Sequence, residues 1–378
     1  MKLIHLSDLH LGKRIHQFSM QDEQKEILRQ ILQIIDDEAP DAVLIAGDIY
    51  DKSVPPAESV MLFDDFLVNL RLRNLQVFVI SGNHDSPERI AFGSRIMENG
   101  GIHLSPVYDG NIRPFSMSDA YGEVHIYMLP FIKPSHVRRY FADEEIVTYT
   151  DAVRVAIRHM NVNPDERNVL VTHQFVTGAS RSDSEEISVG GSDNVDASVF
   201  CDFDYVALGH IHSPQTCGAE HIRYCGTPLK YSFSEMRDTK SVTVVELNVG
   251  APVIRTVALT PIHDMSEIRG TFEALTSPDF YTQCDQKDHY LRIVLTDEHD
   301  IPDAVGRLRM IYKNLMNLEY DNTRTRQHAI ISGSSQTKTK TPLELFMEFY
   351  ELQNNAKMSD EQRQYMCALI EKVEEDLI

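Results

Sequence analysis

The sequence predicts an α/β fold with more than one domain. Short, nearly continuous apolar runs, which are typical of strands buried on both faces of a sheet, recur along its first two thirds. They occupy residues 2–7, 42–46, 76–80, 124–129, 168–172 and 204–208. Apolar residues at helical spacing fill 22–38 and 57–73, between the first three runs. Strands that alternate with helices indicate a layered α/β fold, and 378 residues are too many for one ordinary core.

Residues 240–260 have the pattern of a β-hairpin, so we end the first domain at residue 261. A small α/β cap is expected over 262–331. Its predicted elements are a helix at 264–276, a strand at 289–296, a helix at 302–316 and a returning strand at 325–331.

The segment 332–341, SGSSQTKTKT, lacks apolar side chains and is expected to be a flexible linker. Two amphipathic helical patterns follow in 342–378. The second opens with Ser359 and Gln362, which have the spacing of a capping box.

The composition is that of a soluble globular protein, with 42% hydrophobic and 25% charged residues. No apolar run approaches the roughly 18 residues that span a bilayer, and the start has no signal-peptide pattern, so we expect a cytoplasmic protein without a membrane segment. The five cysteines form no C-x-x-C pair, which favours reduced thiols packed as small apolar groups.

The formal net charge of −21 argues by itself against a nucleic-acid binder, because such proteins usually present basic surfaces to phosphates. Two effects weaken that argument. Carboxylates that hold metal ions are partly neutralised by them, and a partner subunit can supply the basic surface.

Five short motifs each lie at or just after the carboxyl end of a predicted strand. They are Asp8-Leu9-His10, Gly47-Asp48-Ile49-Tyr50-Asp51, Gly82-Asn83-His84-Asp85, Thr172-His173 and Gly209-His210-Ile211-His212. Ligands of open α/β sheets bind at that end of the strands, so five such loops can converge on one site.

Taken singly, each motif is a weak signal. A lone histidine such as His173 is more often a hydrogen-bonded core or surface residue than a ligand, Asp8 could cap a turn, and Gly47 and Gly82 could be turn residues. With this histidine content, H-x-H arises by chance roughly 0.7 times in such a chain. The order of all five motifs, each after an apolar strand, makes the functional interpretation the stronger one.

The side chains in these motifs are oxygen and imidazole donors without thiolate, a set that suits manganese, iron or zinc. The candidate metal ligands are Asp8, His10, Asp48, Asn83, His173, His210 and His212. Seven donors with one shared carboxylate suit two ions about 3.5–4 Å apart. Residues i and i+2 of an extended segment point the same way, so the pairs 8/10 and 210/212 can each reach one site.

The motifs D-x-H, G-D-x-x-D, G-N-H-D, H and G-H-x-H resemble those of the calcineurin-like metallophosphoesterase superfamily over residues 1 to about 260. The resemblance implies a four-layer α-β-β-α sandwich with two divalent ions, most consistent with Mn²⁺, at one edge. It further implies which residues bind each ion. Asp8, His10, Asp48 and His212 would bind one ion, and Asp48, Asn83, His173 and His210 the other.

The same resemblance implies that His84 binds no metal and instead protonates the leaving oxygen, while hydroxide activated by the ions attacks the phosphorus. Histidine titrates near neutral pH, which suits this role. A carboxylate at the position of Asp51 orients this histidine in related phosphatases, so His84 and Asp51 are the candidate catalytic residues.

Over residues 172–233 the chain is more closely similar to the DNA exonuclease subunits of break repair within that superfamily. This implies 3′–5′ exonuclease and single-strand or hairpin endonuclease activity, a cap that binds DNA, and a homodimer formed through helices near 57–73 and 87–98. The helices of 342–378 would dock on the coiled coil of an ATPase subunit, giving a heterotetramer. The simpler alternatives are that the tail folds back on its own domain and that the dimer helices pack only on their own sheet.

Two other functions remain open at this point. One is a phosphatase or cyclic-nucleotide phosphodiesterase on the same scaffold, since fold does not determine substrate. The other is a non-catalytic scaffold for the ATPase, against which the complete ligand set and His84 argue.

Overall fold

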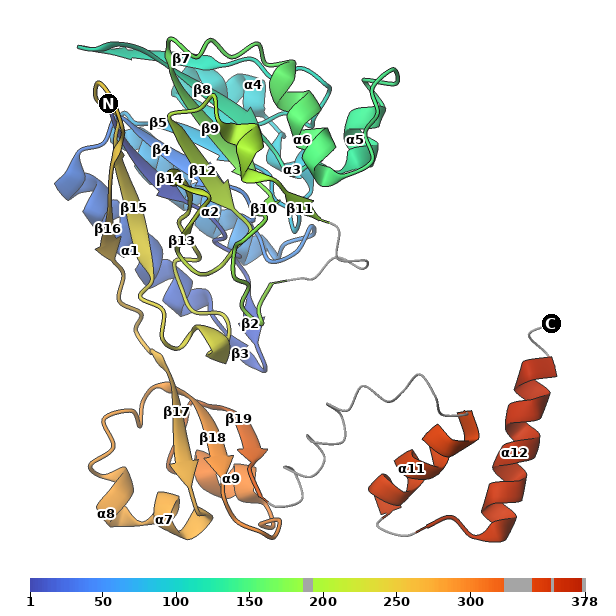
Figure 1. The fold of residues 1–378 in the computed structure, drawn as a ribbon. Helices are drawn as coiled ribbons and strands as arrows, with labels where there is room; N and C mark the ends of the chain where they lie inside the picture. Colours follow the sequence, from blue (N-terminus) through green and yellow to red (C-terminus); the bar gives the residue numbers. More distant parts are fainter. Residues whose placement is uncertain (186–192, 323–341, 355–356, 376–378) are drawn as a thin grey trace. The chain divides into compact units, whose positions relative to one another are not determined.

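Two six-stranded sheets form the centre of the fold (Figure 1). The computed structural model describes residues 1–185, 193–322, 342–354 and 357–375. In spatial order, the first sheet consists of β16 (Val253–Ala258), β15 (Ser241–Glu246), β1 (Lys2–Leu6), β4 (Ala42–Ala46), β5 (Gln76–Ile80) and β6 (Ile102–Leu104). The second consists of β13 (Gln215–Cys217), β14 (Ala219–Tyr224), β12 (Tyr205–Gly209), β9 (Arg167–His173), β8 (Gly122–Leu129) and β7 (Phe115–Asp119).

The six strands predicted from apolar runs are all present, and they form the inner part of the two sheets. In the first sheet β1, β4, β5 and β6 are parallel, and in the second β8, β9, β12 and β14 are parallel. Parallel strands of a sandwich are covered on both faces, which explains why every residue of β4 and β12 is buried. The predicted hairpin at 240–260 is confirmed as β15 and β16, which pair antiparallel.

The inner faces of the sheets share one apolar core, which includes Leu44, Phe78, Val171 and Ala207. Helices α1 (Gln21–Glu38) and α2 (Ala57–Leu72) cover the outer face of the first sheet through a second core, and α6 (Tyr149–Arg158) covers the second sheet through a third. The predicted four-layer α-β-β-α sandwich is therefore confirmed.

Shorter elements complete this part of the chain. They are β2 (Arg14–Ile15), β3 (Phe18–Ser19), α3 (Pro87–Ile90), α4 (Ser94–Met97), α5 (Pro134–Arg138), β10 (Phe175–Val176), β11 (Asn194–Val195) and three 3₁₀ turns at Glu98–Gly100, Ala197–Phe200 and Phe233–Glu235. The hairpin of β2 and β3 and the parallel pair of β10 and β11 lie outside the two large sheets.

A three-stranded sheet of β17 (Met265–Gly270), β18 (Tyr290–Leu295) and β19 (Leu315–Tyr320) follows, with α7 (Phe272–Thr276), α8 (Pro278–Tyr281) and α9 (Ala304–Arg309). The helix predicted at 264–276 is wrong over its first half, which is β17. Met265, Ile268, Phe272 and Leu275 are all buried, and their spacing of three to four mimics one helical face although the chain changes from strand to helix at Thr271. The helix predicted at 302–316 is likewise shorter, and the returning strand expected at 325–331 lies outside the described residues.

The tail contains α11 (Pro342–Asn354) and α12 (Asp360–Glu375), as the amphipathic patterns predict. The capping box is confirmed, because Gln362 N donates to Ser359 Oγ and Ser359 N donates to Gln362 Oε1. The linker predicted at 332–341 lies outside the described residues. By contacts, the chain splits into one unit of residues 1–269, 273–294 and 303–319 and another of 270–272, 295–302 and 320–378.

Within the described residues, no helix is both long enough and apolar enough to cross a bilayer.

Candidate metal centre

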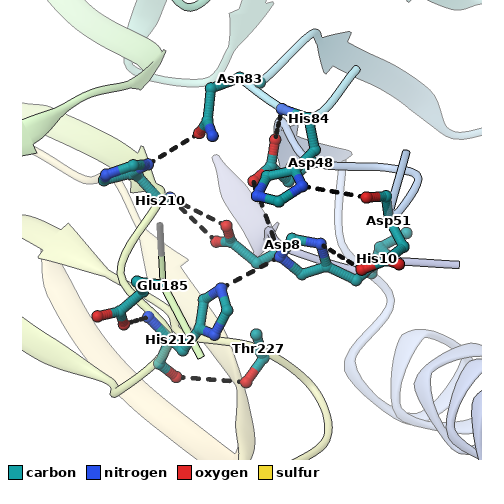
Figure 2. A network of polar contacts seen from close by, with 12 residues as sticks. Asp8, His10, Asp48, Asp51, Asn83, His84, Glu185, His210, His212 and Thr227 are labelled. Atoms are coloured by element: carbon teal, nitrogen blue, oxygen red, sulfur yellow. Dashed lines mark hydrogen bonds and ion pairs between the residues drawn. The ribbon is translucent and has the colours of Figure 1, made fainter. Parts of the chain in front are cut away.

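The seven predicted ligands and His84 converge at the carboxyl ends of five strands from both sheets (Figure 2 shows seven of these eight). Asp8 and His10 follow β1, Asp48 follows β4, and Asn83 follows β5. His173 ends β9, and His210 and His212 follow β12. Since β4 packs across the sandwich against β9 and β12, the two sheets deliver their loops to one place.

Side-chain donors from distant parts of the chain lie within a few ångströms of one another. His10 Nε2 is 3.1 Å from His212 Nε2 and 3.7 Å from Asp48 Oδ2. Asp48 Oδ2 is also 3.4 Å from His173 Nε2, and Asn83 Oδ1 lies 3.0 Å from that nitrogen and 2.9 Å from His210 Nδ1. The order of the motifs along the sequence is thus matched by their meeting in space.

Three groups of donors have the spacing needed to hold a cation. Asp8, His10 and His212 form one, Asp8, Asp48 and His173 form the second, and His10, Asp48 and His84 form the third. Asp8, His10 and Asp48 each belong to two of these groups, so the donors form one continuous cluster, in which Asp48 lies between His10 and His173.

The loops that carry these groups depart from ordinary backbone conformations. Among the described residues, nine non-glycine residues have positive φ, and four of them are the predicted ligands Asp8, His10, Asp48 and His210. Such conformations are sparsely populated and are found where a functional site over-determines the backbone. The concentration of strain at this edge is therefore independent support for a built site.

The close approach of β12 to β4 explains why residue 209 is a glycine. A Cβ there would lie 1.9 Å from Ala46 O and 2.6 Å from His173 Nδ1, so any larger residue would separate β4 from β12. His173 Nδ1 lies 2.8 Å from Ala46 O and donates its proton to that carbonyl. In the neutral ring, Nε2 therefore carries the lone pair and faces Asn83 Oδ1 at 3.0 Å, and a cation satisfies two acceptors that face each other in this way.

The histidines have the electrostatics of ligands. Burial lowers the pKa of His10 and His212 well below the usual value and that of His210 to about 3, which keeps these imidazoles in the neutral form that binds metal. His173 differs. Burial alone would lower its pKa, but the charge of Asp48 outweighs this and raises it to about 9, so a cation would displace a proton from its Nε2.

The two central carboxyl groups also require a positive charge between them. Burial raises the pKa of Asp8 to about 8, and the charge of Asp48 adds to this effect. Burial would likewise raise the pKa of Asp48, but the adjacent imidazoles of His173 and His10 hold it well below its usual range. The residues present therefore fit divalent ions, because a cation stabilises the charged form of both carboxylates.

His84 sits at the partly exposed side of the centre. Its Nδ1 is 3.0 Å from the main-chain oxygen of Asp51, and its Nε2 is 3.9 Å from Asp48 Oδ2. The sequence led us to expect the Asp51 carboxylate beside this ring. The structure instead places the Asp51 carbonyl there, and the carboxylate pairs with Lys13 Nζ at 2.8 Å.

Sequence reasoning missed several groups that hold the ligands in place. Asp85 accepts hydrogen bonds from the main-chain nitrogens of Ile49, Tyr50 and Gly82, which ties the loops after β4 and β5 together. The tetrad that contains Asn83 and His84 also contains Asp85, so that signal was available. Gln24 and Tyr231, which bind the carbonyls of residues 10 and 9, had no such signal, since they lie far from every motif.

Comparisons with known proteins place the chain in a family. Residues 1–214 match the calcineurin-like phosphoesterase family model, and 261–354 match a model described as the type 5 capsule protein repressor C-terminal domain. The chain is 33% identical over 340 residues to the SbcD subunit of the nuclease SbcCD from Staphylococcus epidermidis, covering 88% of this chain and 89% of the relative.

Two solved structures are also similar to part of the chain. A dimetal phosphatase from Danio rerio matches 68% of this chain and 96% of its own at 12% identity, with a TM-score of 0.41. A Thermus thermophilus protein matches 68% of this chain and 98% of its own at 13% identity, with a TM-score of 0.39. On its match to the family model and its identity to the relative, the chain belongs to the calcineurin-like phosphoesterase family and, within it, to the group of SbcD nuclease subunits.

Proposed function

We propose that this chain is the cytoplasmic nuclease subunit of an SbcCD-type complex and hydrolyses DNA phosphodiesters, as a 3′–5′ exonuclease and a single-strand or hairpin endonuclease. The observation that carries the proposal is the convergence of carboxylate and imidazole donors, with Asp48 between His10 and His173, beside the partly exposed His84. Identity to a nuclease subunit over most of both chains favours this substrate over a small phosphate ester.

Two divalent ions, most consistent with Mn²⁺, fit the donor set of carboxylate, amide and imidazole groups. Asp8, His10, Asp48 and His212 would hold one ion. Asp48, Asn83, His173 and His210 would hold the other, with Asp48 shared. When bound, the ions supply a strong nucleophile at neutral pH and neutralise charge on the phosphoryl oxygens.

His84 would deliver the proton that the departing sugar oxygen needs. In the imidazolium form, Nδ1–H donates to the carbonyl of Asp51, which fixes the ring. The Nε2–H remains available on the open side of the centre. Asp51 acts here through its carbonyl, while its carboxylate holds Lys13.

A nicking assay separates the nuclease from the phosphatase or cyclic-nucleotide phosphodiesterase alternative. Supercoiled plasmid and end-labelled hairpins are incubated with the chain and Mn²⁺, in parallel with cyclic AMP and p-nitrophenyl phosphate. We expect cleavage of DNA that EDTA abolishes and excess Mn²⁺ restores. Turnover of the small esters with intact DNA would contradict the nuclease proposal, and turnover of neither would favour the scaffold alternative.

The two tail helices provide a docking element for an SbcC-type ATPase. They enclose a groove of 360 Å³ lined mainly by Phe346, Tyr350, Met358, Tyr365 and Met366. Phe349 and Tyr365 are 56% and 70% exposed, so apolar surface is left for a partner. Helix-in-groove packing against the base of a coiled coil is the matching mode. The partner would also bring basic surface to DNA, which reconciles the net charge of −21 with this substrate.

Removing residues 342–378 is expected to abolish binding to the SbcC-type subunit and to leave Mn²⁺-dependent cleavage of single strands intact. The reason is that the seven predicted ligands lie within residues 8–212. A pull-down with the ATPase subunit measures the first effect, and a single-strand cleavage assay provides the internal control. Undiminished capture of the ATPase by the truncated chain would refute the docking role.

A homodimer is proposed through α2 and the segment that follows β5. Met61 and Leu72 on α2 are 65% and 75% exposed, and Phe92 and Ile96 are 82% and 81% exposed. Exposed apolar side chains of this size on both elements supply apolar surface for an interface between two copies. With two ATPase subunits the dimer would form a heterotetramer, and a purely monomeric chain in sedimentation at micromolar concentration would count against it.

We further propose that residues 1–261 form the nuclease domain, 262–331 a DNA-binding cap, 332–341 a linker and 342–378 the docking segment. Limited proteolysis tests these boundaries, with first cuts expected within 332–341.

A further inference from the structure

His212 is held in a way that differs from His173. The Nδ1 of His173 bonds to a main-chain carbonyl of β4, whereas the Nδ1 of His212 lies 2.6 Å from a side-chain hydroxyl, that of Ser184. Ser184 belongs to the segment between β10 and β11, outside all five sequence motifs. A point substitution can therefore remove the partner of His212 without changing a strand.

The direction of the hydrogen bonds that link His212, Ser184 and Glu235 follows from the ion pair of Glu235 with Lys240. Ser184 Oγ is 2.6 Å from Glu235 Oε1, and Glu235 Oε2 is 2.6 Å from Lys240 Nζ. A carboxylate paired with an ammonium group only accepts hydrogen bonds, so the Ser184 hydroxyl donates to Glu235. Its oxygen then accepts from Nδ1–H of His212, which leaves the lone pair on Nε2, the nitrogen that lies 3.1 Å from His10 Nε2.

The Glu235–Lys240 pair is buried, with side-chain exposures of 0% and 3%. Burying an ion pair carries a large desolvation cost, and apolar residues of similar volume often stabilise a protein as well or better. Stability alone is therefore a weak explanation for this pair. Both of its members act on His212, because Lys240 Nζ also donates to the His212 carbonyl at 2.9 Å.

The main chain of His212 is fixed on its other side as well. Its nitrogen donates to Glu185 Oε1 at 2.6 Å (Figure 2). Its carbonyl accepts from Thr227 N at 3.0 Å. The ring, the main-chain nitrogen and the main-chain carbonyl of His212 are thus each held by a hydrogen bond.

We propose that Ser184, anchored by the Glu235–Lys240 pair, is a positioning residue that fixes the tautomer and orientation of His212 and so sets the affinity of one of the two metal sites. The proposal rests on the proposed function only in taking His212 as a ligand. It assigns a role to Ser184: metal occupancy at one site depends on this residue and on the turn that carries Glu235.

The test is a calorimetric Mn²⁺ titration of the full-length chain and three variants. Ser184→Ala removes the hydroxyl, Ser184→Thr keeps it, and Ser180→Ala makes the same chemical change elsewhere in the same segment, away from His212. Substitutions of groups that orient a metal-bound histidine typically weaken metal affinity 10- to 100-fold. We expect about that loss for one of two ions in Ser184→Ala, with affinity restored in Ser184→Thr and unchanged in Ser180→Ala.

Electron paramagnetic resonance adds a readout that a general loss of stability would not move. With two equivalents of Mn²⁺, the wild type is expected to give the signal of a spin-coupled pair, and Ser184→Ala that of isolated ions. Two ions bound by Ser184→Ala with wild-type affinity would overturn the positioning role. A wild type that binds two ions but cuts no DNA would refute the proposed nuclease function alone.

Discussion

Replacing Asp48 with asparagine is expected to remove both metal sites at once and to lower DNA cleavage by roughly 10³-fold or more, since bound metal contributes several kcal/mol to such reactions. Asp48 Oδ2 lies close to both halves of the centre, at 3.4 Å from His173 Nε2 and 3.7 Å from His10 Nε2. An amide of the same shape keeps the packing but loses the charge that two cations share.

The measurement is metal stoichiometry by calorimetry, followed by plasmid nicking. Asp37→Asn, the same change on the exposed side of α1, serves as the matched control and should bind two ions and cut DNA like the wild type. Circular dichroism verifies that the Asp48→Asn chain is folded. Retention of two tightly bound ions in Asp48→Asn would show that this carboxylate is not shared.

Replacing His84 with alanine is expected to leave two ions bound and to reduce DNA cleavage by about 10²–10⁴-fold, the usual contribution of a general acid. The ring lies 3.9 Å from Asp48 through Nε2 and is fixed through Nδ1 by the Asp51 carbonyl. It is also partly exposed, with 13% of its side-chain surface accessible. The histidines assigned as ligands are buried more deeply: His10 and His173 fully, and His210 with 8% of its surface exposed.

A substrate whose leaving group needs no proton tests the role of His84 as proton donor. Bis(p-nitrophenyl) phosphate releases a phenolate that needs no proton, so its hydrolysis by His84→Ala should fall far less than cleavage of DNA. His16→Ala, at an exposed histidine outside the centre, is the control for loss of an imidazole. An equal loss on both substrates would contradict the role as proton donor, and loss of an ion would make His84 a ligand.

Much of this centre could be predicted from the sequence because two patterns coincide. Apolar runs locate strands, and the polar residues that follow them must lie at one edge of a parallel sheet, which is how Asp48 and Asn83 could be placed together from their positions in the chain. Placing the motifs in space then requires only the order of the strands in the sheet, and β4 does lie between β1 and β5.

The residues that support His212, the strand β17 and the contact of His84 with Asp51 had no periodic or positional signal in the sequence. Ser184 and Glu235 come from segments without regular apolar spacing, and nothing in the pattern of the predicted hairpin distinguishes Lys240 at its start. The contact of the three residues depends on how two loops fold over His212. The strand at Met265–Gly270 was mistaken for helix because Met265 and Ile268 have helical spacing. The Asp51 carbonyl could not be anticipated either, because sequence reports side chains while any residue can present a carbonyl.

Anomalous diffraction at the manganese edge, from crystals grown with Mn²⁺, tests the central claim most directly. Two peaks about 3.5–4 Å apart are predicted, both within bonding distance of Asp48, with His212 on one ion and His173 on the other. A single peak, or two peaks of which only one contacts Asp48, would contradict it.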